Sequence, residues 1–321
     1  MPVVYHSSYK APFLIWNPHA QTIYSSVFRR VGGVRYERER IDTPDGDFID
    51  LDWSRTDSKR AVIVLHGLES CSQASYMRGM VRAFNRRGWD AAAYNFRGRS
   101  GEPNRLYRSY HSGATDDLEV VVSHVIRLGC YDQLALVGFS LGGNVTLKYL
   151  GEKGANVSEV IRTAAAVSVP CDLESCSWKL AQRSNFIYMK RFLIFLGRKM
   201  KQKKHLLPDG LTLDDFRKAK NFKDFDNLYT APAHGFADAK EYWSKCSSRQ
   251  FVSSIAIPTL LISARDDPFL TEKCFPFEEA EASEHFHLEV PEVGGHVGFV
   301  SFNSGGEYWH ESRAVEFVES V

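Results

Sequence analysis

Residues 133–144 read QLALVGFSLGGN, an apolar strand-forming run that leads directly into a glycine-rich turn. The turn is Gly138-Phe139-Ser140-Leu141-Gly142, and a helical pattern over 141–150 follows it. A serine on a sharp turn between a strand and a helix is exposed to a neighbouring base, and its flanking residues are small because the backbone is crowded there. The helix N-terminus also favours negative charge that develops near Ser140. The stretch therefore predicts a serine nucleophile at the carboxyl end of a buried strand.

Alternating strand and helix patterns extend to both sides of this turn. Short runs rich in β-branched residues predict strands over 60–66, 90–96, 163–169, 257–264 and 285–290, and helical spacing predicts helices over 75–87, 114–128 and 309–318. Ahead of them, 34–43 and 47–55 flank Thr-Pro-Asp-Gly and predict a hairpin, so the N-terminal third reads as strands. This alternation is typical of βαβ units. The predicted class is α/β, with a mostly parallel, twisted sheet of about eight strands flanked by helices.

The alternation stops at about Pro170 and resumes near residue 254. We expect a core over 1–170, with the segment 1–33 packed on it, a helical cap over 171–253, and the second part of the core over 254–321. The cap region holds 16 Lys and Arg against 9 Asp and Glu, whereas the remainder holds 24 against 30. Both ends of this insertion follow or precede core strands at the edge that carries Ser140. The cap is therefore expected to cover the serine and to supply most of an acyl pocket.

The composition is that of an ordinary globular chain: of 321 residues, 44% are hydrophobic and 25% are charged, with a net charge of +1. This balance gives no argument for binding nucleic acid. The six cysteines form no CxxC pair, so free thiols in a reducing, cytoplasmic compartment are expected. No signal-peptide pattern and no apolar run near the ~20 residues of a membrane span are recognised. No obligate protein partner is evident.

A serine nucleophile needs a base and an acid that orients the base. Folds with this turn place them in the order serine, acid, histidine. The strand 257–264 runs into Arg265-Asp266-Asp267-Pro268, and both aspartates are candidates, with Asp267 favoured by its spacing from Ala264. The favoured base is His296, in a glycine-rich loop after the last strand.

Three further histidines follow the aspartates. His310 falls in the terminal helix, and His285 and His287 alternate along a strand. That pair suggests a metal site, but no third ligand is in evidence. The favoured interpretation is that both histidines are ordinary side chains on the surface of a strand. We expect no metal and no cofactor.

The oxyanion of an acyl-transfer transition state needs two backbone N–H donors. One is expected from Leu141, the residue after the nucleophile. The other is expected from Leu68 in His66-Gly67-Leu68-Glu69-Ser70, where Gly67 allows a tight bend. His66 is interpreted as a structural residue beneath this loop.

Five stretches together resemble the α/β-hydrolase superfamily, and within it the branch of bacterial YheT-like hydrolases and their eukaryotic relatives. They are NPHAQT at 17–22, HGLES at 66–70, NFRG at 95–98 with YHSG at 110–113, GFSLGGN at 138–144, and DDPF at 266–269 with GGHVGF at 294–299. The resemblance implies an α/β-hydrolase fold, a triad of Ser140, Asp267 and His296, and action on lipid-like carboxylic esters. Ser70 departs from the glycine frequent in this branch, which bears on loop shape. The triad leaves His19, Gln21 and His111 unexplained, and a structural role is favoured over lining the acyl pocket.

Three functions remain open at the level of sequence. The leading hypothesis is a serine carboxylesterase or lipase that acts on a small-molecule ester through an acyl-enzyme. An acyltransferase with the same residues and a non-catalytic binding module are the alternatives.

The basic stretch 186–205 of the cap suggests a possible membrane contact. It carries Arg198, Lys199, Lys201, Lys203 and Lys204. An ordinary cap helix with a solvated basic end is the favoured interpretation, and peripheral contact with an anionic lipid surface is the other.

Overall fold

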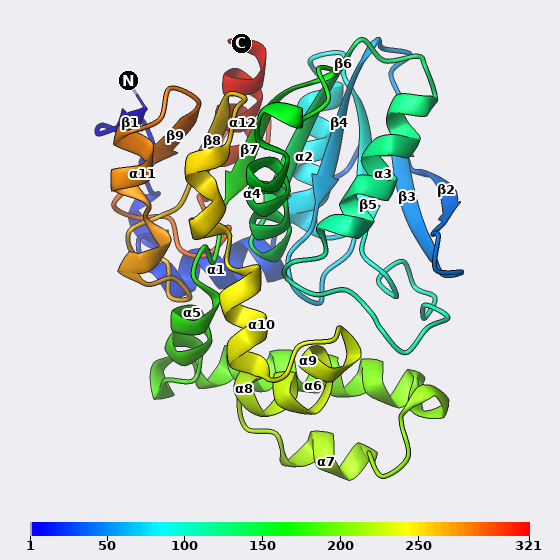
Figure 1. The fold of residues 1–321 in the computed structure, drawn as a ribbon. Helices are drawn as coiled ribbons and strands as arrows, with labels where there is room; N and C mark the ends of the chain where they lie inside the picture. The colour runs from blue at the N-terminus through cyan, green and yellow to red at the C-terminus, as the bar shows by residue number, and fades with distance from the viewer. Residues whose placement is uncertain (1) are drawn as a thin grey trace.

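A nine-stranded sheet of order β1-β9-β8-β7-β6-β4-β5-β3-β2 forms the centre of the structure, a computed structural model that describes residues 2–321 (Figure 1). The strands are β1 Val3–Val4, β2 Glu37–Asp42, β3 Phe48–Ser54, β4 Arg60–Leu65, β5 Asp90–Asn95, β6 Gln133–Phe139, β7 Ile161–Val167, β8 Thr259–Ile262 and β9 Phe286–Glu289. Only the hairpin β2–β3 is antiparallel to its neighbours, and the other neighbouring strands pair in parallel. The predicted mostly parallel sheet is confirmed.

The central strands are apolar along their whole length because helices cover both faces of the sheet. In β4, RAVIVL, every residue after Arg60 is buried, as is every residue of β6 after Gln133. Continuous burial of this kind belongs to parallel strands between two helical layers.

Each helical layer packs its own apolar core against one face of the sheet. Helices α2 Ser75–Asn85 and α12 Trp309–Glu319 pack on one face, whereas α3 Thr115–Arg127, α4 Leu141–Lys153 and α11 Phe277–Glu281 pack on the other. The helices predicted over 75–87, 114–128, 141–150 and 309–318 are all present, with ends shifted by a few residues.

The N-terminal segment departs from the expectation of strands alone. It contains the short turn η1 Phe13–Ile15 and the helix α1 Pro18–Val27. Asn17 caps α1 by accepting hydrogen bonds from the backbone N–H groups of His19 and Ala20, and Pro18 occupies the first turn, where it costs no hydrogen bond. The ninth strand, β1, adds two residues parallel to β9 and is too short for a periodic signal.

The helices of the insertion lie below the carboxyl ends of the parallel strands, on the side where β6 ends at Ser140 (Figure 1). They are α5 Leu173–Leu180, α6 Phe186–Gln202, α7 Leu213–Lys218, α8 Phe222–Phe225, α9 Ala231–Ala233 and α10 Ala239–Cys246, with the short turns η3 Arg183–Asn185 and η4 Lys204–Leu206. Between α8 and α9 the π-helix η5 covers Asp226–Thr230. After α10, the turn η6 Ser248–Ser254 packs back on α4 of the core, where Gly151 approaches Phe251 so closely that a Cβ would meet its carbonyl oxygen.

Candidate active site

Ser140 lies on a strained turn between β6 and α4. Its backbone has φ 51° and ψ −117°, a left-handed conformation that is rare for a residue with a side chain. The glycines on both sides are needed for close approach: a Cβ on Gly138 would lie 2.4 Å from the carbonyl oxygen of Gly142, and one on Gly142 would lie 2.6 Å from that of His66. The sequence Gly-Phe-Ser-Leu-Gly is thus the one that this turn can accommodate.

The structure brings Ser140, Asp267 and His296 together in one hydrogen-bonded line. His296 Nε2 lies 3.0 Å from Ser140 Oγ, and His296 Nδ1 lies 2.8 Å from Asp267 Oδ2. Asp267 is buried, and its other oxygen accepts a hydrogen bond of 2.8 Å from the backbone N–H of Phe269. These contacts hold the imidazole between the hydroxyl and the carboxylate, as a nucleophile, base and orienting acid require.

Asp266, the other acidic candidate, points away from the imidazole. Its Oδ1 accepts a hydrogen bond of 2.9 Å from the backbone N–H of Gly295, so it holds the glycine-rich loop rather than the ring. Burial raises the pKa of Asp266 to about 6, and the nearby charge of Asp267 adds to this rise. The two neighbouring aspartates therefore occupy different environments, and only Asp267 contacts His296 through its side chain.

The loop that carries Leu68 bends beside the nucleophile. A Cβ on Gly67 would lie 3.2 Å from Ser140 Cβ, which explains the glycine. Within residues 2–321, the backbone N–H groups of Leu68 and Leu141 donate to no protein acceptor. His66 is fully buried beneath the loop, where its Nε2 accepts from the backbone N–H of Phe96, and burial lowers its pKa to about 3. It is thus a neutral structural residue, as predicted.

A buried charged network, which sequence reasoning missed, holds the Leu68 loop in place. Arg99 contacts the Glu69 carboxylate at 2.9 Å and donates to the carbonyl oxygens of Glu69 and Ser70. The Tyr110 hydroxyl donates to Glu69 Oε1 and accepts from the Glu69 backbone N–H, both at 2.8 Å. Lys199 of the cap helix α6 approaches the same carboxylate at 3.6 Å. The network links the core, the cap and the loop beside Ser140.

Helix α1 supports the loop of His296, which gives a role to the NPHAQT stretch. Thr22 Oγ1 accepts a hydrogen bond of 2.8 Å from the backbone N–H of His296. Gln21 is fully buried, and its Oε1 accepts from Tyr9 Oη and from the backbone N–H of Val300. Neither side chain belongs to a strand or follows one, so the alternation of elements gave no signal for them. Gln21 therefore has the structural role that was favoured, and Thr22 holds the backbone of His296.

The remaining two unexplained histidines lie between core and cap. His19 stacks on Tyr188 of α6, with its Nδ1 3.0 Å from the Tyr188 hydroxyl. His111 is surrounded by the rings of His234, Phe236 and Tyr242 from the cap. The YHSG and NPHAQT stretches therefore join the insertion to the core, and His111 also lines the cavity described next.

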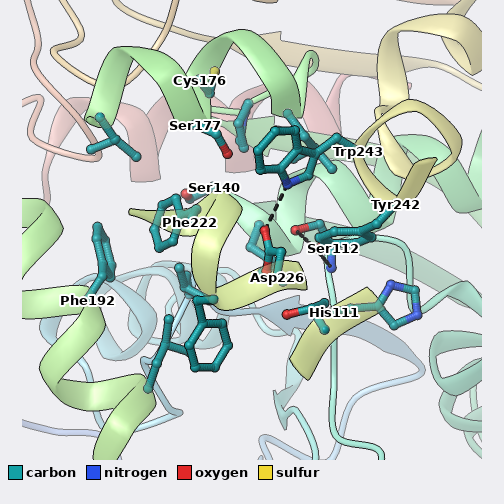
Figure 2. Close-up of a pocket in the computed structure, with 18 of the residues that line it drawn as sticks. His111, Ser112, Ser140, Cys176, Ser177, Phe192, Phe222, Asp226, Tyr242 and Trp243 are labelled. Carbon is teal, nitrogen blue, oxygen red and sulfur yellow. Dashed lines mark hydrogen bonds between the residues drawn. The ribbon is translucent and has the colours of Figure 1, made fainter. Parts of the chain in front are cut away.

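Two cavities meet at Ser140 and His296. The first, the cap pocket, has a volume of about 110 Å³ and reaches into the insertion (Figure 2). Its apolar wall comes from Leu173, Leu180, Phe192, Leu196, Phe222 and Phe225. Its far wall is polar: Asp226 accepts a hydrogen bond of 2.8 Å from Trp243 Nε1, and Tyr242 donates to Ser112 Oγ (Figure 2). Burial raises the pKa of Asp226 to about 7.

The second cavity lies between α1 and α6 and has a volume of about 230 Å³. Its wall is mostly apolar, with rings from Phe192, Phe195 and Phe269. Hydroxyl groups on this wall come from Thr22, Ser25, Ser26, Ser70, Ser75 and Tyr76. Ser26 of α1 and Arg191 of α6 are both exposed, so this second pocket reaches the surface between these helices. Ser140 thus lies between two cavities, each with a mostly apolar wall that also carries hydroxyl groups.

The basic stretch of α6 is not uniformly solvated, which corrects the expectation for its five charges. Lys199 and Lys203 are buried, and Lys203 Nζ donates to Asn104 Oδ1 and to the carbonyl oxygens of Tyr107 and Arg108. Burial lowers the pKa of Lys199 to about 8 and that of Lys203 to about 7. The side chains turn inward because core carbonyl and carboxylate oxygens face them, which the sequence of α6 alone does not reveal.

The structure offers no alternative centre for a metal ion within residues 2–321, where no group of three or more His, Cys, Asp or Glu side chains could hold one. His287 packs its ring on Phe317 of α12. In the same range, no helix is long and apolar enough to cross a membrane.

Comparison with known proteins identifies the class. The family described as "alpha/beta hydrolase fold" matches residues 60–300. Among solved structures, an esterase from Pyrococcus furiosus, Pf2001, superposes with a TM-score of 0.59 at 22% identity, covering 91% of this chain and 96% of that one. The chain belongs to the α/β-hydrolase family.

Relatives that match most of this chain are named as esterases and lipases. The chain is 35% identical over 313 residues to a protein of Escherichia coli (strain K12) named "Putative esterase YheT", covering 94% of this chain and 90% of the relative. It is 29% identical to the mouse "Phospholipase ABHD3", covering 93% and 74%, and 26% identical to a yeast "Monoacylglycerol lipase", covering 92% and 64%. The resemblance to the YheT-like branch is confirmed, and the chain is a hydrolase of the esterase and lipase type.

Proposed function

We propose that this protein is a serine hydrolase that cleaves carboxylic esters with short or medium acyl chains, including monoacylglycerol-like lipid esters. The observation that carries the proposal is the line Ser140–His296–Asp267, with contacts of 3.0 and 2.8 Å, at the junction of two cavities. The cap pocket, which reaches into the insertion, suits an acyl chain, and the second pocket, which reaches the surface between α1 and α6, suits the alcohol part. The names of the esterase, phospholipase and lipase relatives are in keeping with both.

The first half of the reaction forms an acyl-enzyme. Ser140 Oγ bonds to the carbonyl carbon of the ester as its proton passes to His296 Nε2, while Asp267 accepts from Nδ1–H and stabilises the imidazolium. The carbonyl oxygen becomes an oxyanion, which the N–H groups of Leu68 and Leu141 stabilise by hydrogen bonds. The bond to the alcohol oxygen then breaks, and the alcohol leaves with the proton from His296.

The second half returns the enzyme to its starting state. Water enters, gives a proton to His296 Nε2 and attacks the acyl carbon, again with the oxyanion held by the two N–H groups. The bond to Ser140 Oγ breaks, the serine recovers its proton from His296, and the carboxylic acid leaves. The steps need only residues of this chain, the ester and one water molecule.

The test is the Ser140→Ala variant, assayed on p-nitrophenyl esters of graded chain length and on monoacylglycerol. Loss of the nucleophile is expected to lower kcat by at least about 10³-fold. Ser177→Ala, which changes another serine of the cap pocket, is the matched control and should retain activity. A fluorophosphonate probe should label the wild type and the control but not Ser140→Ala. Near-wild-type turnover by Ser140→Ala, or failure of the wild type to take the label, would contradict the proposal.

Acyl transfer is a second candidate, supported by the separate pocket beside Ser140 that reaches the surface and carries several hydroxyl groups. An alcohol bound there could attack the acyl-enzyme in place of water, which would yield a new ester. The two reactions are distinguished by the ratio of ester to acid formed when an alcohol such as glycerol is present. A product that is mainly ester at low glycerol concentration would favour the transferase.

A further inference from the structure

Exposed apolar side chains gather on two segments that are distant in sequence. On η1 and just after it, Phe13 is 89% exposed, Leu14 87% and Trp16 64%. At the start of α6, Phe186 is 62% exposed and Ile187 72%. Aromatic and branched side chains so exposed are costly in water unless another surface covers them. These five residues are called the docking surface below.

The two segments lie side by side in the fold. His19, in the first turn of α1, stacks on Tyr188, which directly follows Ile187, and α1 begins directly after Trp16 and Asn17. Figure 1 also shows α1 at the edge of the core that faces the cap. The docking surface therefore flanks the same pair of helices, α1 and α6, between which the second pocket reaches the surface.

The two chain segments that carry the docking surface hold charges of one sign. Residues 1–36 contain four Lys and Arg and no Asp or Glu, and residues 175–208 contain nine Lys and Arg and no Asp or Glu. Arg29 of the first segment is buried in an ion pair with Glu311, and Lys199 and Lys203 of the second are also buried. Arg183, Lys190 and Arg191 are exposed beside Phe186 and Ile187. The net charge of the whole chain is only +1, so this concentration is local.

We infer that the docking surface binds an anionic lipid bilayer. Its apolar side chains enter the boundary between headgroups and acyl chains, and the exposed basic residues contact anionic headgroups. This combination favours a lipid surface over a second protein copy, because two copies would bring like charges together. The role of this contact rests on the proposed function. When the docking surface lies on the bilayer, the second pocket, which leads to Ser140, faces esters in the bilayer.

Sedimentation with vesicles tests the contact without relying on catalysis. The full chain carrying Ser140→Ala is mixed with vesicles of phosphatidylcholine alone, or of phosphatidylcholine with phosphatidylglycerol. Binding is expected to be stronger to the anionic vesicles and to weaken as salt rises. Phe13→Ser, Leu14→Ser and Ile187→Ser together should weaken it by at least about tenfold. Arg183→Gln with Lys190→Gln should weaken binding to the anionic vesicles by about tenfold.

Controls separate the docking surface from general stickiness and from catalysis. Leu128→Ser with Val321→Ser removes apolar side chains that are exposed elsewhere, at 40% and 55%, and should leave binding unchanged. The docking variants, made with Ser140 intact, should hydrolyse a soluble short-chain ester at the wild-type rate, which also reports that they fold. Absence of vesicle binding by the Ser140→Ala chain with an intact docking surface, or equal binding by the docking and control variants, would overturn the inference. So would a dimer that the docking variants dissociate while vesicles remain unbound.

Discussion

At the scale of single residues, the two neighbouring aspartates after β8 show how position decides chemistry. Asp267 accepts from His296 Nδ1, whereas Asp266 accepts from the backbone of Gly295. Asp267→Asn should lower kcat by ~10⁴-fold, since an amide cannot hold the imidazole in the required tautomer or stabilise its positive form. Asp266→Asn retains an oxygen that can accept from the backbone N–H of Gly295. It should lower kcat by less than about tenfold, which corresponds to the net contribution of one hydrogen bond. Steady-state kinetics on a soluble ester provide the check, and the reverse ranking would assign the orienting acid to Asp266.

Asp226 offers a pH-dependent test of the buried polar wall of the cap pocket. Burial raises its pKa from 3.8 to about 7, so the unfolded chain loses this proton near pH 4 while the folded protein keeps it until about pH 7. The wild type therefore loses stability across this interval, by roughly 4 kcal/mol if the whole difference is realised. The Asp226→Asn variant has no carboxyl group at this position, so it should not lose this stability as pH rises. Its amide oxygen can still accept the hydrogen bond from Trp243 Nε1.

The measurement is the free energy of unfolding of wild type and Asp226→Asn at pH 5 and pH 8. The advantage of the variant should grow with pH, since other titrating groups cancel in the difference. A difference between wild type and Asp226→Asn that is the same at both pH values would contradict the buried environment of Asp226.

At the scale of elements, α1 acts on the site through one hydrogen bond. Thr22 Oγ1 accepts from the backbone N–H of His296 and donates to the carbonyl oxygen of Pro18. Thr22→Val keeps the shape but leaves the N–H of His296 without its acceptor, so kcat should fall about five- to tenfold. Thr22→Ser retains the hydroxyl and should restore the rate. Measurement of kcat and KM for both variants tests this role. Equal kcat values for Thr22→Val and Thr22→Ser would contradict it.

At the scale of the whole molecule, the proposed triad lies on the core, and we expect the insertion to select the acyl chain. Phe222→Ala removes a ring from the apolar wall of the cap pocket, so the best p-nitrophenyl ester should become longer. Phe216→Ala is the matched control, because Phe216 packs inside the cap against Phe225 and Tyr229 but does not line that pocket. Both variants should lose stability, by ~3 kcal/mol or more where the ring is fully buried. If both variants prefer a longer ester, the change in preference comes from general loosening of the cap and not from the wall of the cap pocket.

The sequence by itself determined the parts of this protein that depend on local patterns. Periodic apolar runs marked the core strands and the main core helices, and the crowded turn at Gly138–Gly142 singled out Ser140, because both signals come from residues that are near in the chain. It placed both aspartates and His296 at strand ends that meet at one edge of a parallel sheet. Such ends converge in any sheet of this class, so the set of candidates followed without coordinates.

Only the tertiary structure decided between alternatives that depend on distant contacts. Asp267 contacts the ring of His296 and Asp266 contacts the backbone N–H of Gly295, and each pair is 29 residues apart, so no local pattern encodes which aspartate faces the ring. Lys199 and Lys203 turn inward because oxygens of the core face them across the cap. The support of His296 by Thr22 joins segments 274 residues apart. Interactions of this kind form only when the folded chain excludes water and brings the partners within hydrogen-bond distance.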